Sequence, residues 1–399
     1  MINISKETKY DCCGCNACVQ ICPTQCISMT VDEEGFKYPQ IMKDKCIGCN
    51  KCEKVCPIIQ QKNKNSTYSD SKPKTIGGWH KNEEVRKKSS SGGAFTLLAE
   101  FVLKNKGIVF GAGFNENLEV NHMSVEKIEE LDKLRGSKYV QSDIKDTYLR
   151  VEENLKNGRI VLFVGTPCQC AGLDSFLRKD YDKLYKCDFI CHGVPSPLVF
   201  EKYKLYLEEK YNDKIIEFKF RNKEKGWRDL GQMGTIIKFK SGIIIKNIPA
   251  YKDFYMNGFL TDLYLRPSCH DCNFKSIPKY YSDYTIADFW GVKTMYPEIY
   301  DKKGTSLMLI NTNKGINLFD ELKKDFYNVE CNIDIAVKRN PSLLKSSYVS
   351  EYREIFFKDI NTRSFESLAH KYMTIMARII HIVKKVILRK KRKNEKKNI

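Results

Sequence analysis

Eight cysteines near the start of the chain share a spacing that suits iron-sulfur chemistry. Residues 12–23 and 46–57 both read C-x2-C-x2-C-x3-C-P. In such a run three thiolates surround three corners of a 4Fe-4S cubane, and the fourth cysteine reaches across to the other cluster. The two runs therefore predict a ferredoxin-like unit with two 4Fe-4S clusters. We expect one cluster to be held by Cys12, Cys15, Cys18 and Cys56, and the other by Cys46, Cys49, Cys52 and Cys22.

Structural zinc or a disulfide framework is the alternative use for these cysteines. Zinc sites usually pair two cysteines and then leave a gap, whereas both runs here hold four cysteines and end in proline. The spacing therefore favours clusters over zinc. Gly14 and Gly48 are expected to let the backbone bend close to inorganic sulfide. Cys13 and Cys26 fit neither run, and we interpret them as small buried residues beside the clusters.

A second group of cysteines lies in the later part of the chain. One follows a predicted buried strand at residues 159–165, one ends a predicted strand at residues 184–191, and two form a C-x2-C pair. The carboxyl ends of strands in an open α/β sheet converge on one crevice. Four thiolates there fit a third 4Fe-4S cluster or a zinc ion, and two neighbouring clusters favour iron. The expected ligands are Cys168, Cys191, Cys269 and Cys272, with Cys170 and Cys187 as alternatives.

Two further segments suit a phosphate-bearing cofactor. Residues 89–95 (SSSGGAF) place small residues and exposed N–H groups at a predicted helix start, which suits a pyrophosphate. The alternative is an ordinary helix start capped by serines. Residues 135–142 (RGSKYVQS) combine two cations, hydroxyls and an aromatic ring. Residues 111–113 (GAG) lack a third glycine and an opening helix, so a nicotinamide site is unsupported. His192 is interpreted as a hydrogen-bonded structural residue.

Composition limits the classes of protein that the chain can belong to. A length of 399 residues and 42% apolar residues are ordinary for a folded protein of two or three domains. The chain begins with polar residues, and cluster assembly needs free thiolates, so we expect a cytoplasmic location. Nine of the nineteen net positive charges lie in residues 378–399. The body of the chain has no basic stripe with interleaved aromatics, so no nucleic-acid partner is expected.

Beyond residue 74 the pattern alternates between short apolar runs and helical stretches, which predicts an α/β domain with a partly parallel sheet. Residues 214–248 instead predict an antiparallel unit with a hairpin turn at Ser241 and Gly242. The expected strands are residues 76–80, 108–114, 159–165, 184–191 and 305–311, and the expected helices are residues 92–104, 143–157, 169–179 and 315–327, with mostly helix after residue 340.

These elements predict α+β and α/β architecture in four segments. Residues 1–59 form the two-cluster ferredoxin domain, residues 60–74 a polar linker, residues 75–345 a mixed α/β domain, and residues 346–399 a helical basic extension. Charges interrupt the apolar residues of the extension, so no run approaches the length of a membrane span. We favour an amphipathic helix at the inner face of an anionic membrane over a helix packed on its own domain with a solvated basic tail.

Several segments together resemble the coenzyme F-420 hydrogenase/dehydrogenase beta-subunit family. The resemblance covers about residues 1–320 and is carried by these segments in order: SSSGGAF at Ser89, LRGSKYVQSD at Leu134, LFVGTPCQ at Leu162, DFICHGVPSP at Asp188, KGWR at Lys225, C-x2-C-x-F at Cys269 and TIADFWG at Thr285. Members of the family bind FAD in the α/β domain beside a 4Fe-4S cluster, and many carry a fused two-cluster ferredoxin domain.

The resemblance implies roles for particular residues. It implies that Cys168, Cys191, Cys269 and Cys272 hold the cluster next to the flavin. It also implies that the glycine-serine segment, the RGSKYVQS segment and residues 165–167 surround FAD. We further expect Tyr139 to stack on a ring and Asp288 and Trp290 to line the crevice. The expected cofactor contacts are Ser91, Gly92, Gly93, Arg135, Ser137, Lys138, Tyr139, Gln141, Gly165, Thr166 and Pro167.

The sequence thus predicts a cytoplasmic iron-sulfur flavoprotein oxidoreductase. Electrons would pass between the clusters and FAD, which couples one-electron and two-electron chemistry. Its partner would be a redox protein or a small electron carrier, and its substrate a deazaflavin-like coenzyme or another hydride-accepting small molecule. The alternative is an electron-transfer adapter subunit of a larger redox or polysaccharide-modifying complex, with no substrate site of its own.

Overall fold

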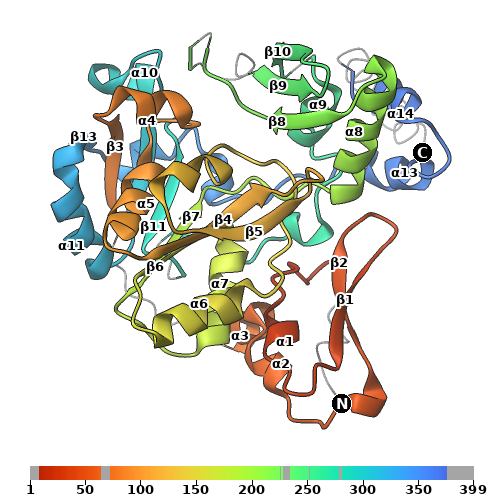
Figure 1. The fold of residues 1–399 in the computed structure, drawn as a ribbon, viewed down its shortest axis with the longest axis horizontal. Coiled ribbons are helices and arrows are strands. Elements are labelled where there is room, and N and C mark those ends of the chain that lie inside the picture. The colour runs from red at the N-terminus through yellow and green to blue at the C-terminus, as the bar shows by residue number, and fades with distance from the viewer. Residues whose placement is uncertain are drawn as a thin grey trace, which may run out of the picture.

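A mixed sheet of eight strands forms the centre of the molecule (Figure 1). The computed structural model describes residues 9–63, 72–224, 226–227, 234–250, 252–277 and 281–374. Four neighbouring strands, β4, β6, β7 and β11, are parallel, and the others pair antiparallel, which confirms the expected partly parallel sheet. In spatial order the strands are β13 (Phe326–Glu330), β3 (Lys74–His80), β12 (Ser306–Ile310), β11 (Tyr284–Asp288), β7 (Leu184–Phe189), β6 (Val161–Val164), β4 (Ile108–Phe114) and β5 (Val120–Val125).

Helices cover both faces of this sheet because the central strands are apolar on both sides. Successive strand residues point to opposite faces. Phe110 and Phe163 pack on the side of α6 (Thr147–Lys156) and α7 (Pro167–Leu177). Val109 and Leu162, their neighbours in sequence, pack on the side of α5 (Ala94–Lys104) and α11 (Asn313–Leu322). The shorter helices around the sheet are α4 (Glu83–Lys88), α10 (Val292–Met295) and α12 (Ile333–Ala336).

Residues 9–63 form a small unit that contains both cysteine runs. It consists of α1 (Ala17–Gln20), α2 (Lys51–Lys54), α3 (Pro57–Asn63) and a hairpin of β1 (Ile27–Val31) and β2 (Lys37–Ile41). In Figure 1 the unit lies below the sheet, and the hairpin rises along one side of the molecule. The helix α3 continues to Asn63, so the first residues of the expected linker are helical.

A second, antiparallel sheet stands above the first one. Its strands are β8 (Ile215–Lys219), β9 (Gly234–Phe239) and β10 (Ile244–Pro249), and the expected hairpin turn at Ser241 and Gly242 joins the last two. Aromatic rings fill the core beneath it, with Phe200 against Tyr255 and Tyr203 against Phe365. The helices that contribute to this core are α8 (Pro197–Tyr211), α9 (Phe254–Leu260), α13 (Arg353–Asp359) and α14 (Phe365–Tyr372).

The sequence prediction was wrong at the end of one helix and missed several strands. The helix expected at residues 315–327 ends at Leu322, because Phe326 begins β13 and pairs with β3. The strands β5 and β11 were not predicted. β5 forms a hairpin with β4, the strand directly before it in the chain, and β11 pairs with β7, about 100 residues earlier. The predicted amphipathic helix and basic tail beyond residue 374 lie outside the described residues. Within the described part, no helix is long and apolar enough to cross a membrane.

Candidate metal centres and cofactor site

The two cysteine runs share one backbone shape. Gly14 and Gly48 both have φ of 69°. Asn16 and Asn50 follow with φ of 66° and 55°, and each precedes a four-residue helix. A left-handed residue costs little for glycine and is tolerated by asparagine, so the sequence lets each loop turn tightly around its thiols. The two cysteine loops therefore have the same backbone conformation.

The thiols of the first run gather at the inner end of the unit. Cys15 and Cys18 are each 8% exposed, and Cys56 from the second run lies beside both of them. Burial and then the neighbouring thiols, Cys12 first among them, raise the pKa of Cys18 well above its usual value. Several thiolates cannot share this buried place unless a positive centre compensates their charge. That donor set fits the expected cluster.

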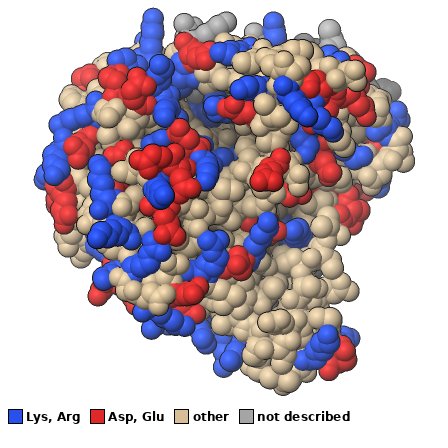
Figure 2. Space-filling view, viewed as in Figure 1, with Lys and Arg blue, Asp and Glu red and all other residues tan. Residues whose placement is uncertain are grey.

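The thiols of the second run are more exposed. Cys49 is exposed, and the neighbouring Ile47 retains 67% of its accessible surface. Cys22, the member expected from the first run, lies with its Sγ 3.4 Å from Sγ of Cys26. Cys26 is buried and also faces Cys46, so it lies beside the second group as a small core residue. Figure 2 shows that the lobe containing this unit carries few charged side chains on the visible face.

The four later cysteines line one cavity that opens partly to solvent. Cys168 lies in the first turn of α7 just after β6, Cys191 follows β7, and β6 and β7 are parallel neighbours. Cys269 ends a short 3₁₀ turn, Pro267–Cys269, and Cys272 follows it. The expected convergence of strand ends thus brings Cys168 and Cys191 together, and the C-x2-C pair closes the cavity.

Hydrogen bonds reach two thiols of this cavity, and burial disfavours an uncompensated thiolate there. The N–H of Val194 donates to Sγ of Cys269 at 3.4 Å, and Oγ1 of Thr166 lies 3.1 Å from Sγ of Cys168. Burial, and then the thiols of Cys191 and Cys272, raise the pKa of Cys269. No group of three or more His, Cys, Asp or Glu side chains in the described part converges as closely as the ligands of a single metal ion do. The thiols surround a cavity, which suits a multi-atom cluster.

Cys13 connects the first run with this cavity. Its thiol interacts with both Cys15 and Cys168, and it lines the cavity. The helix α7 also approaches the first run closely, since a Cβ on Gly172 would lie 2.8 Å from Cβ of Cys15. The sequence interpretation placed Cys13 beside the expected clusters but gave no sign that it lies between the first run and the four-thiol cavity. The alternative ligands Cys170 and Cys187 lie in the sheet core instead, with Sγ of Cys170 3.8 Å from the carbonyl of Cys187.

His192 also lines the cavity, next to Cys191. Its Nε2 lies 2.5 Å from Oδ1 of Asp262, and its Nδ1 lies 3.3 Å from Oγ of Ser342. Both ring nitrogens therefore have partners, which agrees with the interpretation of a hydrogen-bonded structural residue.

The glycine-serine segment forms the start of α5 without a serine cap. Gly93 is the N-cap residue, with φ of 97° and no side-chain hydrogen bond to the first turn. Ser91 donates instead to the carbonyl of Thr305 at 2.8 Å, and Ser89 to that of Val85 at 2.7 Å. The ordinary serine cap considered for this segment is therefore absent. An uncapped helix start offers N–H groups to an anion.

The second predicted segment meets the first at Ser137. Its N–H donates to Oγ of Ser90 at 3.1 Å, and the two hydroxyl oxygens are 3.3 Å apart. Arg135 donates to Oγ1 of Thr96 in α5 at 3.1 Å. Ser90 and Ser137, 47 residues apart in sequence, thus join the two segments where a pyrophosphate was expected.

The side chain of Lys138 contacts backbone carbonyls of its own segment. Its ammonium group donates to the carbonyls of Lys133, Leu134 and Arg135 at 3.3, 2.8 and 2.9 Å. Burial lowers its pKa to about 7. In this structure Lys138 therefore closes the end of a 3₁₀ helix, Ile128–Lys133, and its contact with a phosphate stays a prediction.

Two cations beside the glycine-serine segment were not predicted from the sequence. Arg221 forms a two-bond ion pair with Asp288, with NH1 2.5 Å from Oδ2, and also donates to the carbonyl of Ser90. Lys223 donates to the carbonyl of Ser91 at 2.7 Å. Burial, then the charges of Arg86 and Arg221, lower the pKa of Lys223 to about 7. Their only sequence signal was their position just before the KGWR segment.

The aromatic residues expected in the crevice are packed against other rings. Tyr139 stacks on Phe259 at 4.9 Å between centroids. Trp290 stacks on Trp227 at 5.5 Å, and Nε1 of Trp227 donates to Asp288 at 3.0 Å. Asp288 thus holds both Arg221 and Trp227 in place.

Residues 135–142 lead from the serine contact to the thiols. Ser137 lies at one end, and at the other Gln141 donates to the carbonyl of Cys13 at 3.3 Å. Ser142 accepts from Nε2 of Gln169 at 3.0 Å, and Gln169 completes a capping box with Thr166. Gly165, Thr166 and Pro167 therefore lie at the thiol end, where Pro167 lines the cavity. One segment links the two halves of the predicted site.

Comparison with known proteins agrees with this division of the chain. Residues 75–147 match the coenzyme F420 hydrogenase/dehydrogenase beta-subunit N-terminal family, and residues 158–335 match the C terminus of the same subunit. Residues 11–58 match the 4Fe-4S dicluster domain. Together the two beta-subunit matches cover well over half of the chain.

Among solved structures, the chain is similar to one from the F420-reducing NiFe hydrogenase complex of Methanosarcina barkeri, determined after xenon derivatization. The two are 16% identical, with a TM-score of 0.46, and the match covers 70% of this chain and 92% of that chain. No curated protein matches the chain.

Proposed function

Because the chain belongs to the coenzyme F420 hydrogenase/dehydrogenase beta-subunit family, we propose that it passes electrons between 4Fe-4S clusters and FAD to reduce or oxidise a small hydride-accepting molecule. Family membership makes it an oxidoreductase subunit, and the dicluster domain supplies two 4Fe-4S clusters. The third cluster, the flavin and the substrate are the parts that we add.

The observation that carries the proposal is the cavity lined by four thiols, which adjoins both the first run and the segment 135–142. Cys168, Cys191, Cys269 and Cys272 would hold a third 4Fe-4S cluster there. Cys13 lies between this cavity and Cys15 of the first run. Thiol groups therefore follow one another from the exposed Cys49 to the sheet, as an electron path requires.

The predicted flavin contacts fit a long cofactor that lies beside this path. The uncapped start of α5 at Gly93, with Arg135 nearby, would bind the pyrophosphate. Gln141 and Pro167 lie at the thiol end, where the ring system would come close to the cavity. When bound, the flavin takes up single electrons and transfers a hydride equivalent. Asp288 and Arg221 neutralise each other, so they would shape the crevice and leave its net charge unchanged.

The same features leave a second function open for testing. An adapter subunit would bind clusters and flavin in the same places but turn over no substrate by itself. The two functions differ only in whether a small molecule reacts beside the four-thiol cavity.

Turnover by the anaerobically purified full chain tests the proposal. We expect the dithionite-reduced protein to reduce a deazaflavin coenzyme, measured by loss of its visible absorbance, and to leave pyridine nucleotides unchanged. Reduction of bound flavin without turnover of any acceptor would instead favour the adapter.

A matched pair of arginine variants tests the flavin contacts. Arg135→Met should lower the FAD retained after gel filtration by about tenfold, the loss of one charge-assisted contact of about 1.5 kcal/mol. Arg159 also binds an acidic side chain, Glu126 at 2.8 Å, as Arg135 binds Asp132, but it lies outside both predicted flavin segments. Arg159→Met should therefore retain FAD as the unmodified chain does. Equal retention in both variants would remove Arg135 from the flavin site.

A further inference from the structure

Arg266 lies between the first cysteine run and the four-thiol cavity. It is fully buried, and it lines the cavity immediately before the turn that ends at Cys269. Its side chain extends to the small unit, where Nε donates to the carbonyl of Cys12 at 2.8 Å and NH2 approaches Sγ of Cys12 at 3.7 Å. One guanidinium therefore touches both places where clusters are expected.

The other contacts of Arg266 fix its orientation but leave its charge in place. NH2 donates to the carbonyl of Lys37 at 2.9 Å, and NH1 to Oε1 of Gln141 at 3.0 Å. The guanidinium also lies over the ring of Tyr38, 4.3 Å from the centroid. Within the described residues, no carboxylate contacts it.

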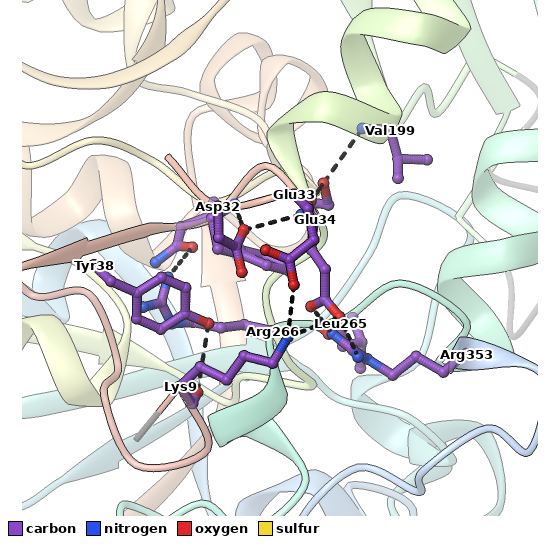
Figure 3. Close-up of polar contacts among 12 residues, drawn as sticks. Lys9, Asp32, Glu33, Glu34, Tyr38, Val199, Leu265, Arg266 and Arg353 are labelled. Atoms are coloured by element: carbon purple, nitrogen blue, oxygen red, sulfur yellow. Dashed lines mark hydrogen bonds and ion pairs between the residues drawn. The ribbon is translucent and has the colours of Figure 1, made fainter. Parts of the chain in front are cut away.

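A second buried arginine in the same region behaves differently. Arg353 binds the carboxylate of Glu34 through two nitrogens, and it also donates to the carbonyl of Leu265 (Figure 3). Both arginines hold the β1–β2 hairpin, but only the charge of Arg353 is neutralised by an acidic side chain. A buried cation without such a partner is costly unless other negative groups surround it. The thiolates of the two expected clusters are the negative groups at hand.

We propose that Arg266 is the shared positive charge that raises the reduction potentials of the first-run cluster and the cavity cluster. Electrons would therefore reside on these two inner clusters in preference to the cluster of the second run. This inference rests on the proposed function. The physical reason is that reduction adds one negative charge to a cluster, and a nearby cation stabilises the reduced state more than the oxidised one. The N–H···S contact with Cys12 acts in the same direction.

Redox titration of the full chain, followed by electron paramagnetic resonance, tests this role. In Arg266→Gln, which keeps amide donors but loses the charge, the first-run and cavity couples should each become at least tenfold harder to reduce, about 59 mV for one electron. The couple of the second run should stay unchanged. Arg266→Lys retains the charge and should shift both couples less than Arg266→Gln does.

The paired change Glu34→Gln with Arg353→Met is the matched control. It removes a buried arginine from the same hairpin contact with no change in net charge, and it should leave all couples within twofold of the unmodified chain. Iron content is measured first in every variant. If Arg266→Gln does not retain iron, the Arg266→Lys titration decides, since a shift as large as a tenfold change despite the retained charge would overturn the proposal.

The outcomes separate this inference from the proposed function. Iron-loaded Arg266→Gln with unchanged potentials would overturn the role of Arg266 and leave the iron-sulfur flavoprotein intact. If the unmodified chain contained iron for two clusters only, the cavity cluster would be contradicted. The effect of Arg266→Gln on the potential of the first-run cluster would then still test the role of Arg266.

Discussion

The two cysteine runs have the same sequence pattern and backbone shape but opposite surroundings. The first run packs against the sheet domain, where the side chains of Arg266 and Gln141 lie so close to Gly14 that a Cβ there would be within 3.0 Å of both. The second run faces solvent, and a Cβ on Gly48 would meet no atom within 4 Å. The same loop conformation thus forms a contact with the sheet domain in the first run and a solvent-facing surface in the second run.

This difference would give the proposed electron path its two ends. Electron transfer between proteins needs a cluster near the surface, and the exposure of Cys49 and Ile47 places the second run there. Transfer inside the protein needs a short route, and Cys13 provides contact between Cys15 and Cys168. The hairpin adds rigidity at the inner end, since Ser196 in front of α8 bonds the carbonyl of Glu34 at 2.5 Å. Variants in matched positions of the two runs can test each part of this account.

Removing one ligand from each run should have the largest effect. Cys18→Ser and Cys49→Ser should each lose the iron and acid-labile sulfide of one cluster, measured by chemical analysis after anaerobic purification. Because Cys18 is 8% exposed and Cys49 is exposed, Cys18→Ser should also lower the unfolding temperature clearly more. Equal unfolding temperatures in the two variants would contradict the distinction between an inner and an outer run.

The hairpin contact of the inner run predicts the next largest effect. Glu34→Ala leaves the buried Arg353 without its carboxylate and should lower the free energy of unfolding by about 3–5 kcal/mol, measured by urea denaturation. Glu33→Ala in the same turn is the control, because Glu33 is 69% exposed and binds Lys9 at the surface. The control should change stability by about 0–1 kcal/mol. Similar losses would show that the hairpin is not held by the buried pair.

The stability of the fold should decrease at acidic pH because of His122, a buried residue of β5. Burial lowers the pKa of His122 to about 4, and its ring bonds Oγ of Ser142 at 2.9 Å. The unfolded chain takes up this proton near pH 6.5 and the folded one only near pH 4, so stability falls as the pH drops through this window. The loss should reach about 2 kcal/mol at pH 5. His122→Asn should remove that slope between pH 7 and 5 in urea denaturation, and an unchanged slope would assign it to other groups.

The glycine pair gives the most closely matched comparison. Gly48→Ala should lower the free energy of unfolding by about 1 kcal/mol, because the left-handed backbone is strained for alanine but its Cβ would meet no other atom. Gly14→Ala should cost about 2–3 kcal/mol, since its Cβ would also lie 2.8 Å from Nε2 of Gln141. Thermal unfolding of the two variants measures the difference. A larger loss for Gly48 would reverse the proposed assignment of inner and outer loops.

Surface charge around the outer run should affect rates and hardly affect stability. Lys43, Lys45, Lys51 and Lys54 are exposed near Cys49. Lys45→Glu with Lys51→Glu should slow reduction by an acidic carrier protein about tenfold at low salt, and the difference should shrink as salt is added. Stopped-flow absorbance measures the rate, and the unfolding temperature serves as the control. If the rate changed neither with these substitutions nor with salt, electrons would enter the protein at another surface.

The sequence predicted those parts of the site that depend on short-range spacing. The cysteine runs, the strand ends before Cys168 and Cys191, and the hairpin at Ser241 and Gly242 all follow from local patterns. The roles of Arg266, Arg221 and Cys13 could not be predicted in this way, because each depends on contacts between segments far apart in the chain. The strand β13 was missed for the same reason, since its partner β3 lies about 250 residues earlier.

The metal, sulfide and flavin content of the anaerobically purified full chain tests the central claim most directly. The account predicts iron and acid-labile sulfide in equal amounts, enough for three 4Fe-4S clusters, together with one FAD in each chain. Zinc in place of iron, or iron clusters without any flavin, would contradict it.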